Sequence, residues 1–117
     1  GSGTTNSNLK NNYSSVNVNL GQEEIETGKH FIGSFIGDHV KTGIGTQLNT
    51  GAVISPCSNI ISNEVSPKYF EPFSWYVDGN LASYRFEDFI ETAKQVKHRR
   101  GMKLSSKEIS FFQQLSQ

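Results

Sequence analysis

Three histidines are the residues of this chain best suited to proton transfer, because an imidazole titrates near neutral pH. His39 directly follows Asp38, and a histidine beside a carboxylate is a candidate general base if a cleft encloses it. A solvated position at a turn is the alternative interpretation of His39. His30 precedes an apolar segment and is expected to be packed, whereas His98 lies in a basic segment and is expected to be solvated. His39 is therefore the candidate catalytic base, and no other catalytic residue is predicted.

A second group of candidates is a basic cluster that contains no acidic residue between Lys94 and Lys103. Cations near the C-terminus of a helix complement its dipole, so a solvated helix end is one interpretation. The other is a phosphate clamp, because guanidinium groups form paired hydrogen bonds to phosphate oxygens. Arg99 and Arg100 are the predicted phosphate-binding residues in that case. The single Cys57 can form neither an intramolecular disulfide nor a zinc site alone, and no metal site is predicted.

A six-residue repeat indicates the element that must position these side chains. Gly37 and Gly43 each follow an anchor of the repeat, and glycine suits a tight corner that a Cβ would obstruct. The period matches neither a helix nor a simple strand alternation, and it predicts a parallel β-helix whose anchors point into the core. The anchors are Ile36, Thr42, Leu48, Ile54 and Ile60, and a small or β-branched residue follows four positions after each of the first four, at Val40, Thr46, Ala52 and Ser58.

Composition favours a narrow core. The chain has 117 residues, of which 34% are hydrophobic, so it can bury a thin solenoid more readily than a wide core. The formal net charge is zero, which argues against general attraction to nucleic acid or membranes. No run of about 18 apolar residues is present. We expect a soluble, cytoplasmic protein with neither nucleic acid nor membrane as a partner.

Outside the repeat, three segments have patterns of their own. Alternating Val16, Val18 and Leu20 predict a short strand, residues 21–26 an acidic turn, and residues 30–32 a return to strand structure. Residues 64–80 carry prolines among aromatic residues, so they are expected to leave the ladder and to wrap over a face or an end of the coil.

The C-terminal part has a helical period from about residue 82, with an apolar stripe at Phe86, Phe89, Ile90, Ala93 and Val96. Gly101 is a natural end for this helix. Ser105 and Glu108 form a capping box that begins a second helix, whose apolar side is Phe111, Phe112 and Leu115. The predicted organisation is β-helix coils over residues 1–63 with a polar insertion near 10–30, an aromatic and proline-rich cap over 64–80, and a two-helix extension over 81–117. The expected fold class is mainly β, a left-handed parallel β-helix followed by an α-helical hairpin.

Several motifs resemble a known family. The segments Gly37–Thr46 and Leu48–Gly51 are similar to the left-handed β-helix of bifunctional bacterial N-acetylglucosamine-1-phosphate uridyltransferases and glucosamine-1-phosphate acetyltransferases. A Bacteroidetes-type branch of sugar nucleotidyltransferases has counterparts of three further segments over residues 1–115: Ser7-Asn8-Leu9-Lys10-Asn11-Asn12-Tyr13, Phe73-Ser74-Trp75 and Arg99-Arg100-Gly101.

The resemblance implies a left-handed β-helix, a homotrimer with sites at the subunit seams, acetyl-CoA as a possible cofactor, and a sugar phosphate or nucleotide sugar as the ligand. It also implies that the catalytic histidine lies in an earlier coil that this chain lacks. The Asn-Tyr site of the family falls either on Asn8, with Leu9 replacing tyrosine, or on Asn12 and Tyr13.

Asn12 and Tyr13 are preferred on chemical grounds, because a phenol beside a carboxamide can hold a sugar or acyl carbonyl. The alternative for Asn12 is a turn former. Lys10 completes the predicted substrate-binding set. The lysine that binds sugar phosphate in the family has no clean counterpart, and Lys29 lies only near its place. Arg99 and Arg100 are predicted to bind the phosphates of the cofactor.

Two functional hypotheses follow. In the first, the chain is the C-terminal β-helix region of a sugar-1-phosphate nucleotidyltransferase/acetyltransferase-like transferase, and it contributes to acetyl-CoA and sugar-phosphate binding in a trimer. In the second, it is a non-catalytic trimerisation or scaffold module of a nucleotidyltransferase. On either hypothesis the isolated chain is expected to lack the base for acyl transfer.

Overall fold

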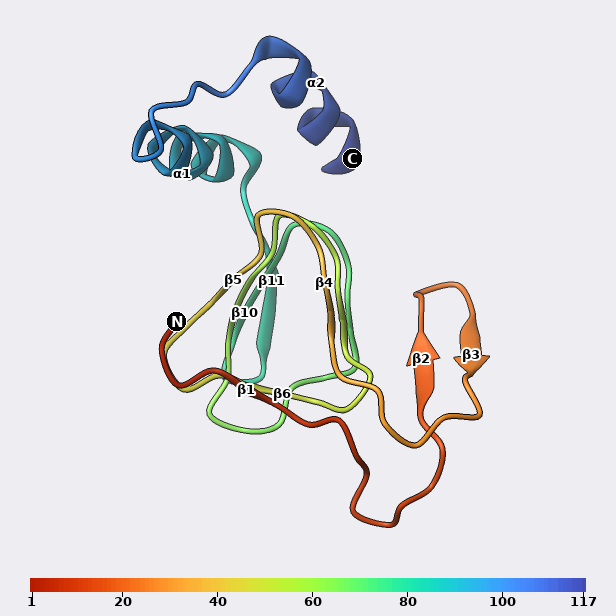
Figure 1. The fold of residues 1–117 in the computed structure, drawn as a ribbon. Coiled ribbons are helices and arrows are strands. Elements are labelled where there is room, and N and C mark those ends of the chain that lie inside the picture. The colour runs from red at the N-terminus through yellow and green to blue at the C-terminus, as the bar shows by residue number, and fades with distance from the viewer.

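Short parallel strands stack beside one another in three ladders. The computed structural model describes residues 1–117 as a mainly β structure with parallel sheets and two helices, 46 × 29 × 27 Å in extent. In Figure 1 the three ladders form the sides of a triangle, and the chain passes from one side to the next. The ladders are β1 (Thr5–Asn6) with β6 (Gln47–Leu48); β4 (Phe35–Ile36), β7 (Val53–Ile54) and β9 (Tyr69–Phe70); and β5 (Lys41–Thr42), β8 (Asn59–Ile61) and β10 (Ser74–Val77).

The register places the anchors of the repeat in columns. Ile36 pairs with Ile54, and Thr42 pairs with Ile60, so β4 and β5 each pair with a strand 18 positions further on. The core that fills the triangle consists of Leu48, Ile54, Ile60 and Phe70, none more than 3% exposed. The small residues Thr46, Ala52 and Ser58 are also buried. The predicted inward position is therefore confirmed for Leu48, Ile54 and Ile60, whereas the first anchor, Ile36, is 54% exposed and Thr42 is half-buried.

Close approach between successive coils explains why glycine directly follows two of the anchors. A Cβ on Gly37 would lie 2.7 Å from the backbone nitrogen of Pro56, and a Cβ on Gly43 would lie 2.7 Å from Cγ1 of Ile61. A Cβ atom essentially never comes this close to another heavy atom, so a side chain at either position would force the neighbouring coil to shift.

The proline-rich stretch continues the ladder, contrary to expectation. Tyr69 pairs with Val53 and Trp75 pairs with Asn59, both at a separation of 16 residues instead of 18. The corner before β9 is two residues shorter, and Pro67 and Pro72 lie outside the paired strands, where a missing N–H does not interrupt a ladder. After β10 the chain turns back into β11 (Asn80–Ser83), an antiparallel strand that ends this sheet.

The insertion forms a separate hairpin of β2 (Asn17–Asn19) and β3 (Glu24–Glu26), paired antiparallel. Part of the predicted acidic turn is thus a strand, and the strand expected over residues 30–32 is not formed. Figure 1 shows the hairpin outside the triangle, near one corner. It is fixed there by Val16 and Val18, whose side chains are buried beside Gly51.

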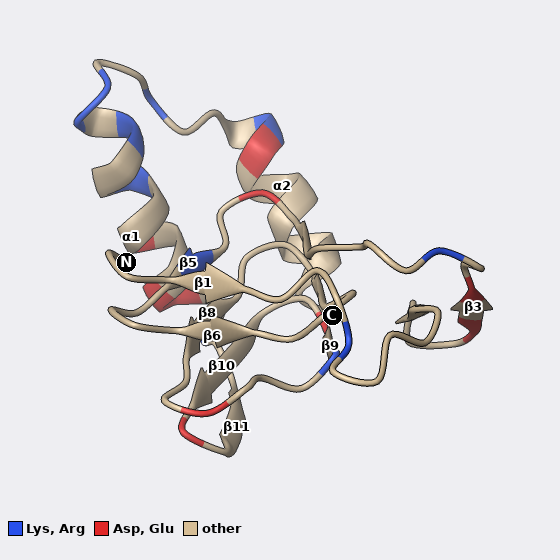
Figure 2. Cartoon of the chain, turned by 60° about the horizontal axis from the view of Figure 1, so that its bottom comes forward, with Lys and Arg blue, Asp and Glu red and all other residues tan.

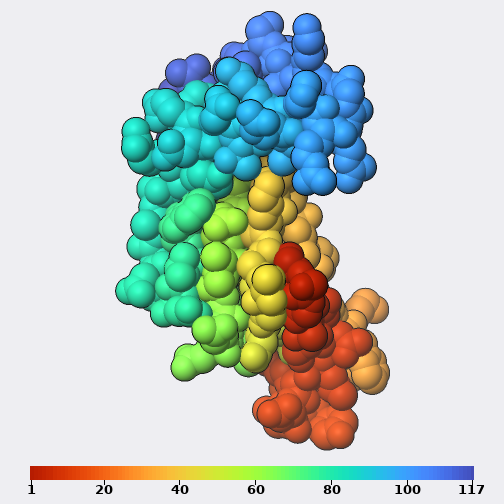
Figure 3. Space-filling view, turned by 90° about the vertical axis from the view of Figure 1, so that its left-hand side faces the viewer, coloured from red at the N-terminus to blue at the C-terminus, as the bar shows by residue number.

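One corner of the triangle carries three side chains that hold the helices. His39, Cys57 and Phe73 occupy equivalent places in successive coils, and their φ angles of 60°, 66° and 60° lie in the left-handed region. Helix α1 (Phe86–His98) and helix α2 (Ser106–Leu115) cover this corner (Figure 3), and Phe89 and Phe112 pack against it. The left-handed conformation of residues other than glycine costs about 1–2 kcal/mol each, which packing against the helices must offset.

The helix ends follow the sequence signals closely. Gly101 has a φ of 68°, and the N–H of Met102 donates to the carbonyl of Lys97. Ser105 and Glu108 form both hydrogen bonds of the capping box, which confirms that prediction. Phe111 is 59% exposed, so it does not belong to the buried side of α2 as expected. Neither helix has the length and apolar character needed to cross a bilayer.

Candidate functional site

Two lysines, Lys68 and Lys10, lie near enough to each other at the base of the β2–β3 hairpin for their charges to interact. Lys68 and Lys10 are both half-buried, and neither forms an ion pair within the protein. The Nζ of Lys68 donates to the backbone carbonyl of Asn17 at 2.7 Å. Burial lowers the pKa of Lys68, the charge of Lys10 lowers it further, and Glu24 acts in the opposite direction. Two neighbouring cations with incomplete partners form a place where an anion would be stabilised.

The loop before the hairpin places the predicted ligands Asn12 and Tyr13. The Oδ1 of Asn12 accepts hydrogen bonds from the N–H of Ser14 at 3.1 Å and from its Oγ at 2.8 Å, so the carboxamide oxygen forms a turn, in agreement with the alternative interpretation. Tyr13 is 71% exposed and has a φ of 61°. Its backbone carbonyl lies 2.9 Å from Nδ1 of His30. The loop is thus pinned by side chains, and the phenol of Tyr13 faces solvent.

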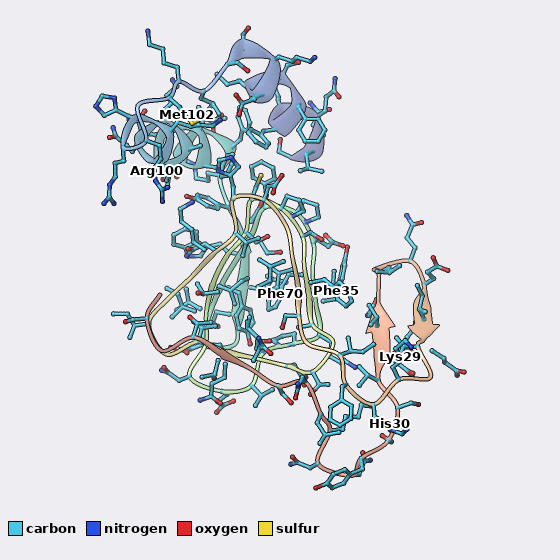
Figure 4. The ribbon with its side chains drawn as sticks, viewed as in Figure 1. Lys29, His30, Phe35, Phe70, Arg100 and Met102 are labelled. Atoms are coloured by element: carbon cyan, nitrogen blue, oxygen red, sulfur yellow. The ribbon has the colours of Figure 1, made fainter.

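His30 departs from expectation, because it is exposed rather than packed. Its imidazole holds the backbone of the loop through the contact with Tyr13. Figure 4 shows His30 and the neighbouring Lys29 below the hairpin, on the side of the molecule away from the helices.

Sequence reasoning missed Lys68. It lies 58 positions after Lys10, next to Pro67, and no spacing connects the two lysines. Lys68 lies in the shortened corner before β9, and its hydrogen bond to Asn17 joins that corner to the hairpin. We refer to Lys10, Asn12, Tyr13 and Lys68 together as the hairpin-base site. Its groups can hold a phosphate and donate hydrogen bonds, but they include no general base.

Arg99 and Arg100 lie at the far side of the molecule. Both are exposed at the end of α1, and Figure 4 shows Arg100 well away from Lys29 and His30. In Figure 2 the basic residues gather on the end of α1, the following loop and the start of α2. A groove of about 520 Å³ lies there, but Arg99 and Arg100 do not line it; its basic residues are Lys94, His98 and Lys103. Within one chain, the predicted substrate and cofactor residues are not brought together.

His39 is enclosed by the helices. Its imidazole lies edge to face with Phe112, with ring centroids 5.2 Å apart, and with Phe89 at 5.6 Å. His39 lies in a turn, as the alternative interpretation had it, but its side chain is half-buried rather than fully solvated. Its ring forms no hydrogen bond with Asp38 or any other residue of the chain. Burial lowers the pKa of His39, and the charge of Lys41 lowers it further, so the imidazole is neutral at neutral pH. The geometry suits a packing residue, since no carboxylate orients the ring as a base.

The curated proteins include a partial relative of this chain. The bifunctional sugar-1-phosphate nucleotidylyltransferase/acetyltransferase of Sulfurisphaera tokodaii is 35% identical over 65 residues. The match covers 56% of this chain, and the chain spans only 16% of the length of that relative. No family model and no solved structure match the chain. The similarity supports the general class of sugar nucleotidyltransferase and acetyltransferase-like proteins suggested by the sequence motifs.

Proposed function

We propose that this chain is a left-handed β-helix region of a sugar-1-phosphate nucleotidyltransferase/acetyltransferase-like protein, and that it binds a sugar phosphate at the hairpin-base site. The observation that carries the proposal is the pair of Lys10 and Lys68, whose charges interact and which form no ion pair with a carboxylate; the exposed Tyr13 belongs to the same loop as Lys10. The partial relative supports the same class of ligand, because its name specifies a sugar 1-phosphate.

Each residue of the site has a distinct task in this proposal. The ammonium groups of Lys10 and Lys68 hold the phosphate, because charge-assisted hydrogen bonds are the strongest polar contacts available at an exposed site. The carboxamide nitrogen of Asn12 and the phenol of Tyr13 donate to hydroxyl or acyl oxygens of the sugar. The base for acyl transfer is supplied from outside these residues.

The proposed assembly is a homotrimer. The hairpin and the helices lie at different corners of the triangle in Figure 1, whereas the successive coils advance across the view of Figure 3. The predicted substrate residues near the hairpin and the predicted cofactor residues on α1 therefore lie at different corners of the triangle, rather than on successive coils at one corner. Parallel packing around a threefold axis would bring Arg99 and Arg100 of one subunit toward the hairpin of the next. Acetyl-CoA would then bind at the seam, in a cytoplasmic enzyme.

A titration of glucosamine 1-phosphate followed by calorimetry tests the proposal. Lys68→Met should weaken binding by about 10-fold to 100-fold, the loss expected for one charged hydrogen bond. Lys107→Met removes an exposed lysine of α2 and should leave the affinity unchanged. Equal affinity of Lys68→Met and wild type would exclude the hairpin-base site.

A scaffold role without catalysis is the second candidate. The packing of His39 against Phe89 and Phe112 favours this role, because the residue predicted as the catalytic base then has a structural task. Trimeric assembly with binding of neither glucosamine 1-phosphate nor acetyl-CoA, measured also in a longer protein containing this region, would select the scaffold role.

A further inference from the structure

A second cleft lies where the coil meets the helices, and the hairpin-base site takes no part in it. It has a volume of about 630 Å³. One wall is the corner segment Asp38–Lys41, and the other is formed by α1 and α2. The residues contributed by the helices are Val96, Lys97, Glu108, Phe111 and Phe112.

Lys41 is the one cation in this cleft without a partner. Lys97 forms an ion pair with Glu108 at 3.1 Å, whereas the Nζ of Lys41 forms no hydrogen bond or ion pair in the chain. Lys41 is nevertheless half-buried, and burial lowers its pKa. A partly desolvated ammonium group without an acceptor is unfavourable until an anion binds it.

The neighbouring thiol cannot supply that anion. Cys57 could stabilise the ammonium group of Lys41, and so raise its pKa, only as a charged thiolate. Burial, however, raises the pKa of Cys57 to about 12. The thiol is therefore protonated at neutral pH. The His39 ring is neutral there, as described above, so it can accept or donate a hydrogen bond without adding charge.

The remaining wall of the cleft is apolar and accessible. Phe111 is 59% exposed and Val96 is 38% exposed, although both lie on helices whose other faces are buried. The carboxylates of Asp38 and Glu108 also border the cleft; Glu108 is paired with Lys97, whereas Asp38 forms no ion pair with Lys41. A polyanion would be repelled by these carboxylates, whereas one negative group at Lys41 with a hydrocarbon body on Phe111 would be complementary.

We propose that the cleft between Lys41 and Phe111 binds a small amphipathic monoanion, an organic carboxylate with an aliphatic or aromatic body. The carboxylate accepts hydrogen bonds from Nζ of Lys41, and the hydrocarbon body covers Val96 and Phe111. This site is independent of the sugar-phosphate site, because its residues lie at a different corner of the coil.

Calorimetric titration with octanoate tests the proposal on the whole chain. Lys41→Met should weaken octanoate binding at least 10-fold, and Phe111→Ala should weaken it several-fold. Lys41→Arg should retain most of the affinity, since it preserves the charge. Lys107→Met provides the matched control and should bind as the wild type does.

Two companion ligands separate charge from hydrophobicity. Octanol, which has the same chain without the carboxylate, and inorganic phosphate, which has no hydrocarbon body, should both bind at least 10-fold more weakly than octanoate. Equal binding of octanol, or octanoate affinity unaffected by Lys41→Met, would overturn the proposal. A change in the mass of the assembly in Phe111→Ala without a change in octanoate affinity would assign the apolar wall to a subunit interface instead and would equally overturn it.

Discussion

The imidazole of His39 and the ring of Phe112 meet edge to face, 5.2 Å between centroids, across the junction of the coil and helix α2. His39 belongs to the first of three successive corners whose residues have left-handed φ angles, and Cys57 and Phe73 occupy the other two. The helices therefore dock on side chains that the coil presents outward. The stability of this docking should depend on the charge of His39.

Acid should weaken the docked helices. The pKa of His39 in the folded protein lies below its ordinary value of 6.5, so the unfolded chain takes up this proton first. The resulting stability is fully present above about pH 6.5 and is lost as the pH falls from there through the folded pKa. Thermal unfolding should therefore show a lower Tm at about pH 5.5 than at about pH 7.5.

His39→Asn should reduce that pH dependence, because asparagine tolerates the left-handed conformation and does not titrate in this range. His98→Asn changes an exposed histidine of α1 and serves as the control. Lys41 and Lys97 lower the pKa of His39, and Asp38 and Glu108 raise it. An identical pH profile in wild type and His39→Asn would remove His39 as the titrating group.

The close contact behind Gly37 gives a second prediction. Gly37→Ala would place a Cβ 2.7 Å from the backbone nitrogen of Pro56, and this rigid neighbour cannot move without shifting the next coil. We expect a loss of about 1–3 kcal/mol in the free energy of unfolding by denaturant, the usual range for overpacking. Gly33→Ala is the control, because its Cβ would meet only Oδ1 of Asn6 at 3.4 Å. Equal stability of the two variants would contradict the close stacking of coils.

The buried core inside the triangle of ladders gives a third prediction. Ile54→Ala removes a side chain that is 1% exposed and packed with Leu48, Ile60 and Phe70. The resulting cavity should cost about 2–5 kcal/mol in the free energy of unfolding. Ile44→Ala, at a residue 79% exposed, should cost far less. Similar losses at both positions would show that residue 54 does not face the core.

The capping box at the start of α2 gives a fourth. Ser105→Ala leaves the N–H of Glu108 without its acceptor, and it should cost about 1 kcal/mol of stability. Ser110→Ala, at an exposed position inside the same helix, should be neutral or slightly stabilising, because alanine has the higher helix propensity. Helix content by circular dichroism and urea midpoints would measure both. A Ser105→Ala midpoint equal to that of the wild type would mean that the cap contributes nothing to folding.

Sequence reasoning predicted the elements whose signals are local. The columns of Leu48, Ile54 and Ile60 follow from a strict six-residue period, and the start of α2 follows from Ser105 and Glu108. The sequence did not predict that the strands containing Tyr69 and Trp75 pair with earlier coils, because the prolines near them argued against strand pairing. Pro67 and Pro72 lie just outside these strands. Their position follows from the register between coils, which residue composition alone does not reveal.

The candidate sites were harder to predict because long-range contacts create them. Lys68 approaches Lys10 only after the coil has formed, and Phe112 encloses His39 only after α2 docks. A sequence indicates which residues can carry charge or accept protons, but it does not show which of them lose water or partners on folding.

The mass of the assembly in solution tests the central proposal most directly, because a seam is needed to join the hairpin of one subunit with the Arg99 and Arg100 of another. Light scattering on the purified chain should give about 39 kDa, for three chains of 13.0 kDa. A mass of 13.0 kDa that does not change with concentration would contradict the trimer and the shared binding site.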